Sequence, residues 1–164
     1  MPKLAELNAL DREEFARVVG PVFEQSSWIA HRGWNARPFS SADDLHEKLC
    51  GVVRDATAAE KLSLVCAHPD LAERTELTPA SQEEQQSAGL GELSGGEQTT
   101  FYERNREYRE HFGFPFVICA RMNNKAEMLD AFAARLQNSP ETELETAIAE
   151  IFKIAKLRLE DLIE

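Results

Sequence analysis

Residues 139–162 read SPETELETAIAEIFKIAKLRLEDL, and this stretch decides the fold class of the chain. Ser139 followed by Pro140 is typical of a helix N-cap with proline at the first helical position. Apolar side chains then recur every three or four residues, as they do on the buried face of a long helix. The apolar positions are Leu144, Ile148, Ile151, Ala155 and Leu162. We therefore predict a final helix that runs from residue 140 to the C-terminus.

Similar helix signals recur along the rest of the chain. Residues 11–14 (DREE), 41–44 (SADD) and 57–60 (TAAE) each carry an N-cap pattern, and Thr78-Pro79 repeats the pairing of a cap with proline. Further helices are expected over residues 22–30 and 97–112, the second ended by Gly113. Only residues 114–120, FPFVICA, have the composition of a strand. Because one short strand builds no sheet, we predict a buried helix there.

These signals predict an all-α fold, with residues 1–164 forming a single compact helical bundle domain with short connections. The chain carries 18 Lys and Arg residues against 29 Asp and Glu residues, a net charge of −11. Such an acidic chain repels a phosphate backbone, so we expect no nucleic-acid partner. An anionic substrate would also be repelled at long range, so its site would need positive charge of its own.

The cysteine and targeting signals indicate an intracellular protein. Cys50, Cys66 and Cys119 lie in apolar stretches and form no CxxC pair, so we expect buried, reduced thiols. No HExxH motif is present, and no metal site is expected. The N-terminus lacks the apolar segment of a signal peptide, and no window approaches the ~18 apolar residues of a membrane span. We therefore expect a cytoplasmic protein with no membrane partner.

Arg158 lies on the apolar face of the last predicted helix, three residues beyond Ala155 and seven beyond Ile151. One interpretation is a snorkelling or salt-bridged arginine near a helix end. The other is a guanidinium directed into a pocket, where its planar group suits a carboxylate or ureido oxygen.

A second unusual helix face is polar. Ser81, Glu84, Gln85 and Ala88 stand at i, i+3, i+4 and i+7, so they share one side of the helix that Thr78 is predicted to cap. Either Ser81 and Glu84 form a second capping box, or the face is a hydrogen-bonding wall that contains one acid.

His68 follows the apolar residues 62–67 directly, and Pro69 moves it out of helical geometry. A helix C-terminus favours a protonated imidazole, which suits a proton donor or an anion contact. A purely structural histidine is the alternative.

Three motifs in order carry a resemblance to a known family. They are HPDLA at residues 68–72, SQEEQQSAGL at residues 81–90, and N-x-x-Y-x-x-x-FGFPFVI at residues 105–118. With Ser27-Trp28 and residues 37–39 (RPF), they resemble the 2-oxo-4-hydroxy-4-carboxy-5-ureidoimidazoline (OHCU) decarboxylases of urate breakdown. The likeness covers nearly the whole chain.

The resemblance implies an all-helical carboxy-lyase, expected to be a homodimer, that needs no cofactor and converts a small-molecule ureidoimidazoline, OHCU, to (S)-allantoin and CO2. His68 matches the family's catalytic histidine and Glu84 the nearby acid, and either of them delivers the stereospecific proton. The matched substrate-binding positions are Pro69, Ser81, Gln85, Phe116, Val117, Ile118, Cys119, Ala120 and Arg158. Two other functions stay open: a non-catalytic binding module, and a helical lyase or hydrolase that acts on a related ureide.

Overall fold

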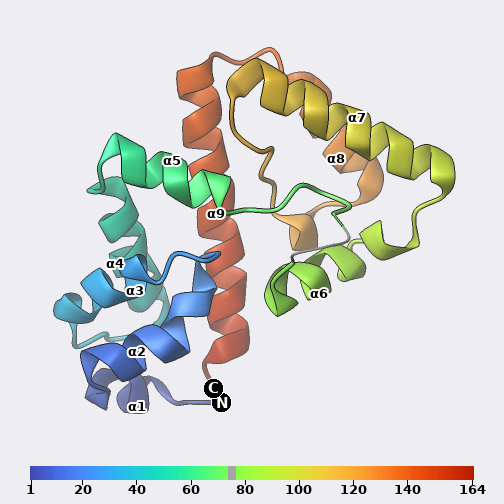
Figure 1. The fold of residues 1–164 in the computed structure, drawn as a ribbon. Coiled ribbons are helices and arrows are strands. Elements are labelled where there is room, and N and C mark those ends of the chain that lie inside the picture. Colours follow the sequence, from blue (N-terminus) through green and yellow to red (C-terminus); the bar gives the residue numbers. More distant parts are fainter. Residues whose placement is uncertain (74–76) are drawn as a thin grey trace. The chain divides into compact units, whose positions relative to one another are not determined.

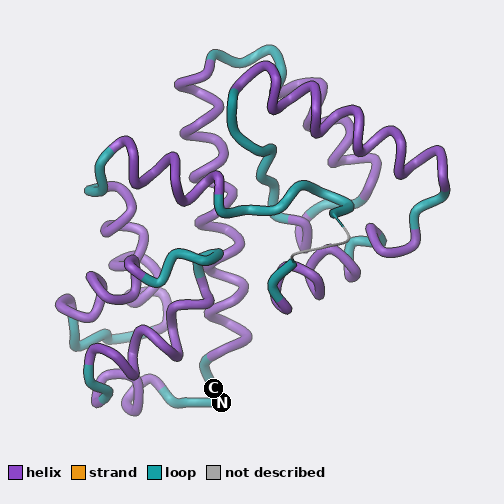
Figure 2. The backbone as a smooth tube through the Cα atoms, in the orientation of Figure 1, coloured by secondary structure: helices purple, strands orange, loops and turns teal. Residues whose placement is uncertain are grey.

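The computed structural model describes residues 1–73 and 77–164, and this part of the chain contains helices and loops but no strand (Figures 1 and 2). The prediction of an all-α fold is confirmed. The chain divides into two compact units, one formed by Met1–Ala67 with Phe152–Glu164 and the other by His68–Ile151. The single domain over residues 1–164 stays a prediction. Among the described helices, none combines the length and the apolar composition needed to cross a bilayer.

The first unit contains α1 (Leu4–Ala9), α2 (Arg12–Val19), α3 (Trp28–Gly33), α4 (Ala42–Arg54), α5 (Ala58–Cys66) and the C-terminal part of α9 (Pro140–Leu162). Asp11, Ser41 and Thr57 cap α2, α4 and α5 by accepting a backbone N–H, as their sequence patterns predict. α3 packs against both α2 and α4. The chain termini meet in this unit, where the Glu164 N–H donates to the Pro2 carbonyl (Figure 1).

The helix predicted over residues 22–30 is wrong. Gly20–Val22 form a 3-10 turn, Phe23 is extended, and α3 begins only at Trp28. The Ser26 hydroxyl donates to the Glu24 carbonyl, and both residues are buried. Burial of these polar groups fixes the turn, and no local pattern of apolar spacing indicates it.

The second unit contains α6 (Pro79–Ser87), α7 (Gly95–Phe112), α8 (Lys125–Arg135) and residues 140–151 of α9. Its core is aromatic: the Tyr108 ring meets the rings of Phe116 and Phe132, which stack on each other with centroids 3.8 Å apart. Gly113 adopts a positive φ of 83° and ends α7, as the sequence predicts.

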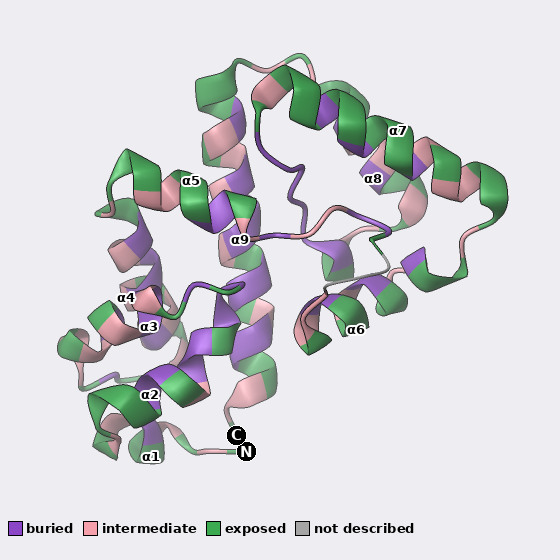
Figure 3. Cartoon of the chain, viewed as in Figure 1, coloured by how far each residue is buried: buried purple, intermediate pink, exposed green. Residues whose placement is uncertain are grey.

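The buried helix predicted over residues 114–120 is wrong. Residues 115–119 have no regular secondary structure, and a 3-10 turn, η4 (Ala120–Met122), follows. Figure 3 shows that residues 114–120 are nevertheless buried without interruption. Side chains from α8 and α9 bind the backbone of Val117 and Cys119, which replaces the hydrogen bonds a helix would have made.

The buried thiol of Cys50 gives the first unit an alkaline stability limit. Cys50 and Cys119 are buried as predicted, whereas Cys66 is exposed, so the prediction is wrong for that residue. Burial raises the pKa of the Cys50 thiol from 9.0 to about 12. Between these values the folded chain keeps a proton that the unfolded chain loses, so the free energy of unfolding falls as the pH rises.

For Cys50 alone, we expect the free energy of unfolding to fall by about 1.4 kcal/mol for each pH unit above pH 9. Urea unfolding at pH 8 to 10.5 measures it, and Cys50→Ala should flatten the slope whereas the exposed-site control Cys66→Ala should not. Equal slopes for the two variants would contradict the assignment.

Candidate active site

Residues 68–72, His68-Pro-Asp-Leu-Ala, form an irregular segment at the start of the second unit, directly after the C-cap of α5 at Ala67. His68 is 6% exposed. Asp70 forms an ion pair with Arg109 of α7, with Nη2 3.0 Å from Oδ1. The Asn105 side-chain amide donates to the Leu71 carbonyl at 2.9 Å. The segment that carries the predicted catalytic histidine is therefore fastened to α7 by two side chains.

Gln85 of α6 binds two backbone groups of the same segment. Its Oε1 accepts the Ala72 N–H at 2.9 Å, and its Nε2 donates to the Asp70 carbonyl at 3.2 Å. Gln98 of α7 donates to the Ala72 carbonyl at 3.2 Å. Gln85 thus orients the His68 segment, a function that the sequence did not indicate, while its predicted contact with substrate stays a prediction.

These contacts hold Ala72 in a conformation that side chains rarely adopt. Its φ is +63°, in the left-handed region, where a residue with a Cβ is strained by about 1–2 kcal/mol. Hydrogen bonds to both its N–H and its carbonyl oppose that strain. Contacts from α6 and α7 therefore set the backbone path from Asp70 to Ala72.

The polar face of α6 points inward, as the predicted hydrogen-bonding wall requires. Ser81 and Gln85 are buried, and Glu84 is half-buried. Thr78 is the N-cap of α6, and its hydroxyl accepts the N–H of Ser81. The alternative capping box at Ser81 is therefore wrong, because Ser81 already lies within the first turn of the helix.

The third predicted element, residues 116–120, lies close to α6, which packs against η4. Burial raises the pKa of the Cys119 thiol, and the carboxylates of Glu150 and Glu84 raise it further. A neutral thiol between two carboxylates makes a poor nucleophile. The second unit thus contains His68, the polar face of α6 and residues 116–120, and α6 contacts both the segment that follows His68 and η4.

Arg158 belongs to the first unit, where it is buried in an ion pair with Glu24. Its Nη2 lies 2.9 Å from Oε2 of Glu24, and its Nη1 donates to the Pro21 carbonyl at 3.1 Å. These contacts agree with the salt-bridged interpretation of the sequence pattern. Its role in substrate binding stays a prediction.

In the second unit, the sequence patterns missed three buried charged residues, Arg135, Glu143 and Glu150. The two glutamates lie seven residues apart on the buried face of α9, which also carries Ala147 and Ile154. A helical-wheel projection of α9 centred on Ala147 and Ile154 would have placed both glutamates on the buried face. The apolar positions quoted from the sequence lie partly off that face, since Leu144 and Ile148 are only half-buried.

A cavity of about 580 Å³ lies between α7 and Asp70–Glu73. Its lining includes Asn105 and Arg109, but not His68 or any residue of α6. It is therefore separate from the predicted substrate-binding side chains. In residues 1–73 and 77–164, no group of three or more His, Cys, Asp or Glu side chains is arranged to hold a metal ion.

Comparison with known proteins identifies the family of the chain. The family model for OHCU decarboxylase matches residues 8–160. The chain is 44% identical to the 2-oxo-4-hydroxy-4-carboxy-5-ureidoimidazoline decarboxylase of Halalkalicoccus jeotgali over 96% of this chain and 89% of that protein. A crystal structure of an OHCU decarboxylase in the presence of (S)-allantoin is 27% identical, with a TM-score of 0.74 over 93% of this chain and 98% of that one. A crystal structure of an (S)-allantoin synthase is 26% identical, with a TM-score of 0.80 over 100% of this chain and 54% of that one. This chain belongs to the OHCU decarboxylase family.

Proposed function

We propose that this protein catalyses the decarboxylation of OHCU to (S)-allantoin and CO2 in urate breakdown. The observation that carries this function is the family match over residues 8–160. The structure supports it because the three motifs of the family lie in one unit, on segments fastened to one another by hydrogen bonds.

His68 and Glu84 are the proposed acid–base pair. His68 is buried, and Glu84 lies on the inward face of α6. Pro69, Ser81 and Gln85 would contact the ureido and ring groups of the substrate. The backbone of residues 116–120 would bind polar atoms of the substrate ring, and the family resemblance assigns Arg158 a contact with a substrate oxygen.

Loss of CO2 breaks the bond between the ring and the carboxylate and leaves an electron pair on the substrate. The sequence contains no motif for pyridoxal phosphate or thiamine diphosphate, so we propose that the unsaturated ring of the substrate takes up that pair. The protein then orients the breaking bond and supplies hydrogen bonds to the developing charge. Proton delivery to one face of the ring, from His68 or Glu84, gives the S configuration.

Freshly generated OHCU tests this function. We expect the protein to accelerate CO2 release above spontaneous decay and to produce the circular-dichroism signal of (S)-allantoin. A rate equal to the background would contradict decarboxylation and favour a binding module. Parallel assays with allantoin, allantoate and hydroxyisourate would identify activity on a related ureide.

A homodimer in the cytoplasm completes the proposal and rests on the family resemblance. Light scattering coupled to gel filtration would give the mass of the assembly, which should be twice the 18.5 kDa of the chain.

A further inference from the structure

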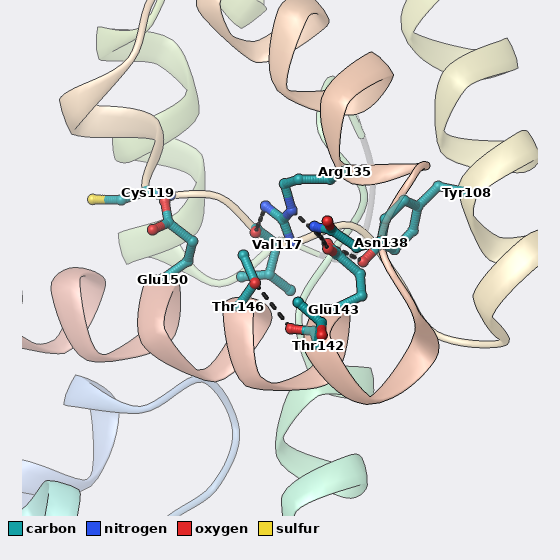
Figure 4. Close-up of polar contacts among 9 residues, drawn as sticks. All are labelled: Tyr108, Val117, Cys119, Arg135, Asn138, Thr142, Glu143, Thr146 and Glu150. Carbon is teal, nitrogen blue, oxygen red and sulfur yellow. Dashed lines mark hydrogen bonds and ion pairs between the residues drawn. The ribbon is translucent and has the colours of Figure 1, made fainter.

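Two buried side chains hold the backbone of residues 116–120 from the side of α8 and α9 (Figure 4). Arg135 of α8 donates from Nη1 to the Val117 carbonyl at 2.7 Å. Glu150 of α9 accepts the Cys119 N–H on Oε1 at 3.1 Å. Each of these two side chains is 8% exposed on a residue basis, so both hydrogen bonds are shielded from water.

The two anchors bind the residues on either side of Ile118. Arg135 binds the Val117 carbonyl and Glu150 binds the Cys119 N–H, so neither anchor occupies the N–H or the carbonyl of Ile118 between them. Within the described part of the chain, neither the N–H nor the carbonyl of Ile118 makes a hydrogen bond. Ile118 itself is 7% exposed, and a buried backbone amide without a partner is rare in proteins. This pair of groups is therefore suited to a ligand.

Arg135 is itself fixed by a buried acid. Its Nε donates to Oε1 of Glu143, which is 0% exposed. Glu143 also accepts the Tyr108 hydroxyl at 2.6 Å and the Asn138 amide at 3.0 Å (Figure 4). Burial and the hydrogen bond to Glu143 raise the pKa of the Tyr108 hydroxyl, so it remains a donor. The guanidinium lies 4.3 Å from the centroid of the Phe116 ring, which packs the start of the segment against it.

A buried ion pair contributes little to stability compared with a well-packed apolar pair. Apolar side chains in place of Arg135 and Glu150, however, would bind neither the Val117 carbonyl nor the Cys119 N–H. The arrangement therefore serves to fix the rotation of this backbone segment about its own axis. A fixed backbone rotation is needed where the N–H and C=O groups of the segment must point at a ligand.

We propose that Arg135 and Glu150 are positioning residues that turn the N–H and carbonyl of Ile118 toward the ureidoimidazoline substrate. The inference rests on the proposed function, in which residues 116–120 bind the substrate through their backbone. Neither side chain is assigned a contact with substrate. Their effect passes through Val117 and Cys119.

Paired replacements of Glu150 test the inference. Glu150→Gln keeps an oxygen that accepts the Cys119 N–H, whereas Glu150→Met has similar length and no such acceptor. We expect kcat/KM for OHCU to fall about 10-fold in Glu150→Met, mainly through KM, and to stay within about 3-fold of wild type in Glu150→Gln, as one hydrogen bond is worth roughly that factor. The affinity for (S)-allantoin, measured by calorimetry, should fall in parallel.

Arg135→Lys gives an independent test, because lysine keeps the charge near Glu143 but lacks the planar group that reaches two acceptors. We expect the same rise in KM. The control is Arg104→Gln, which removes an exposed ion pair with Glu107 on α7 and should leave the kinetics unchanged. Circular dichroism establishes that each variant is folded at the assay temperature.

The outcomes separate the two proposals. If wild-type protein does not accelerate OHCU decay, the proposed function fails. If wild type is active and folded Glu150→Met and Arg135→Lys both bind and turn over substrate normally, the positioning inference is wrong. An equal loss in Glu150→Gln and Glu150→Met would also overturn it, because the carboxylate charge rather than its acceptor oxygen would then matter.

Discussion

Replacing His68 with asparagine is expected to lower kcat for CO2 release from OHCU by at least about 100-fold. A positioned proton donor contributes roughly 10²- to 10⁴-fold to rate, and asparagine resembles histidine in size and hydrogen bonding but does not exchange a proton near neutral pH. KM should change less, because the amide still fills the buried position. Stopped-flow measurement of OHCU decay, with the spontaneous rate subtracted, gives both parameters.

His111→Asn is the matched control for this replacement. His111 is exposed in the last turn of α7, so the same chemical change there should leave kcat unaltered. A folded His68→Asn protein that forms (S)-allantoin near the wild-type rate would remove His68 from the mechanism. Glu84→Gln would then be the next variant to measure, since Glu84 is the other proposed acid.

Glu24→Ala is expected to reduce the free energy of unfolding by about 3–5 kcal/mol. The side chains of Glu24 and Arg158 are 1% and 7% exposed, so removing the carboxylate breaks a buried ion pair, and breaking such a pair from one side is strongly destabilising. The Pro21 carbonyl also accepts a hydrogen bond from Arg158, at 3.1 Å. Urea unfolding near pH 7, followed by far-UV circular dichroism, measures the loss.

Glu14→Ala is the control for that loss. Glu14 pairs with Arg17 on the exposed side of α2, where an ion pair contributes about 0–1 kcal/mol. Similar effects at Glu14 and Glu24 would contradict a special contribution from the buried pair.

The Glu24–Arg158 pair also changes how positive charge is supplied to an anionic substrate. One of the two interpretations of the sequence makes Arg158 a local cation for the substrate in a chain of net charge −11. The structure gives it a carboxylate partner, so the pair as a whole is close to neutral. The kinetics of Arg158→Lys would measure what the guanidinium adds to substrate binding.

Much of the helical framework could be predicted from the sequence because its signals are local. The Asp11, Ser41 and Thr57 caps act within three residues, and Gly113 ends α7 by its own backbone freedom. The shared polar face of α6 followed from spacing alone, since side chains three and four residues apart share a side of any helix, whereas its inward orientation was one of two alternatives. The motif residues of the candidate site were readable for the same reason: each motif is contiguous.

Tertiary structure alone decided the conformation of residues 114–120 and the pairing of the buried charges. The composition of that segment is compatible with a helix or a strand, and the choice depends on Arg135 and Glu150, 18 and 31 residues away from the atoms they bind. The partner of Arg158 lies 134 residues distant, which no periodic pattern specifies. Buried charges need partners from any part of the chain, so the sequence by itself determined the helices and their caps, whereas packing determined which polar groups meet.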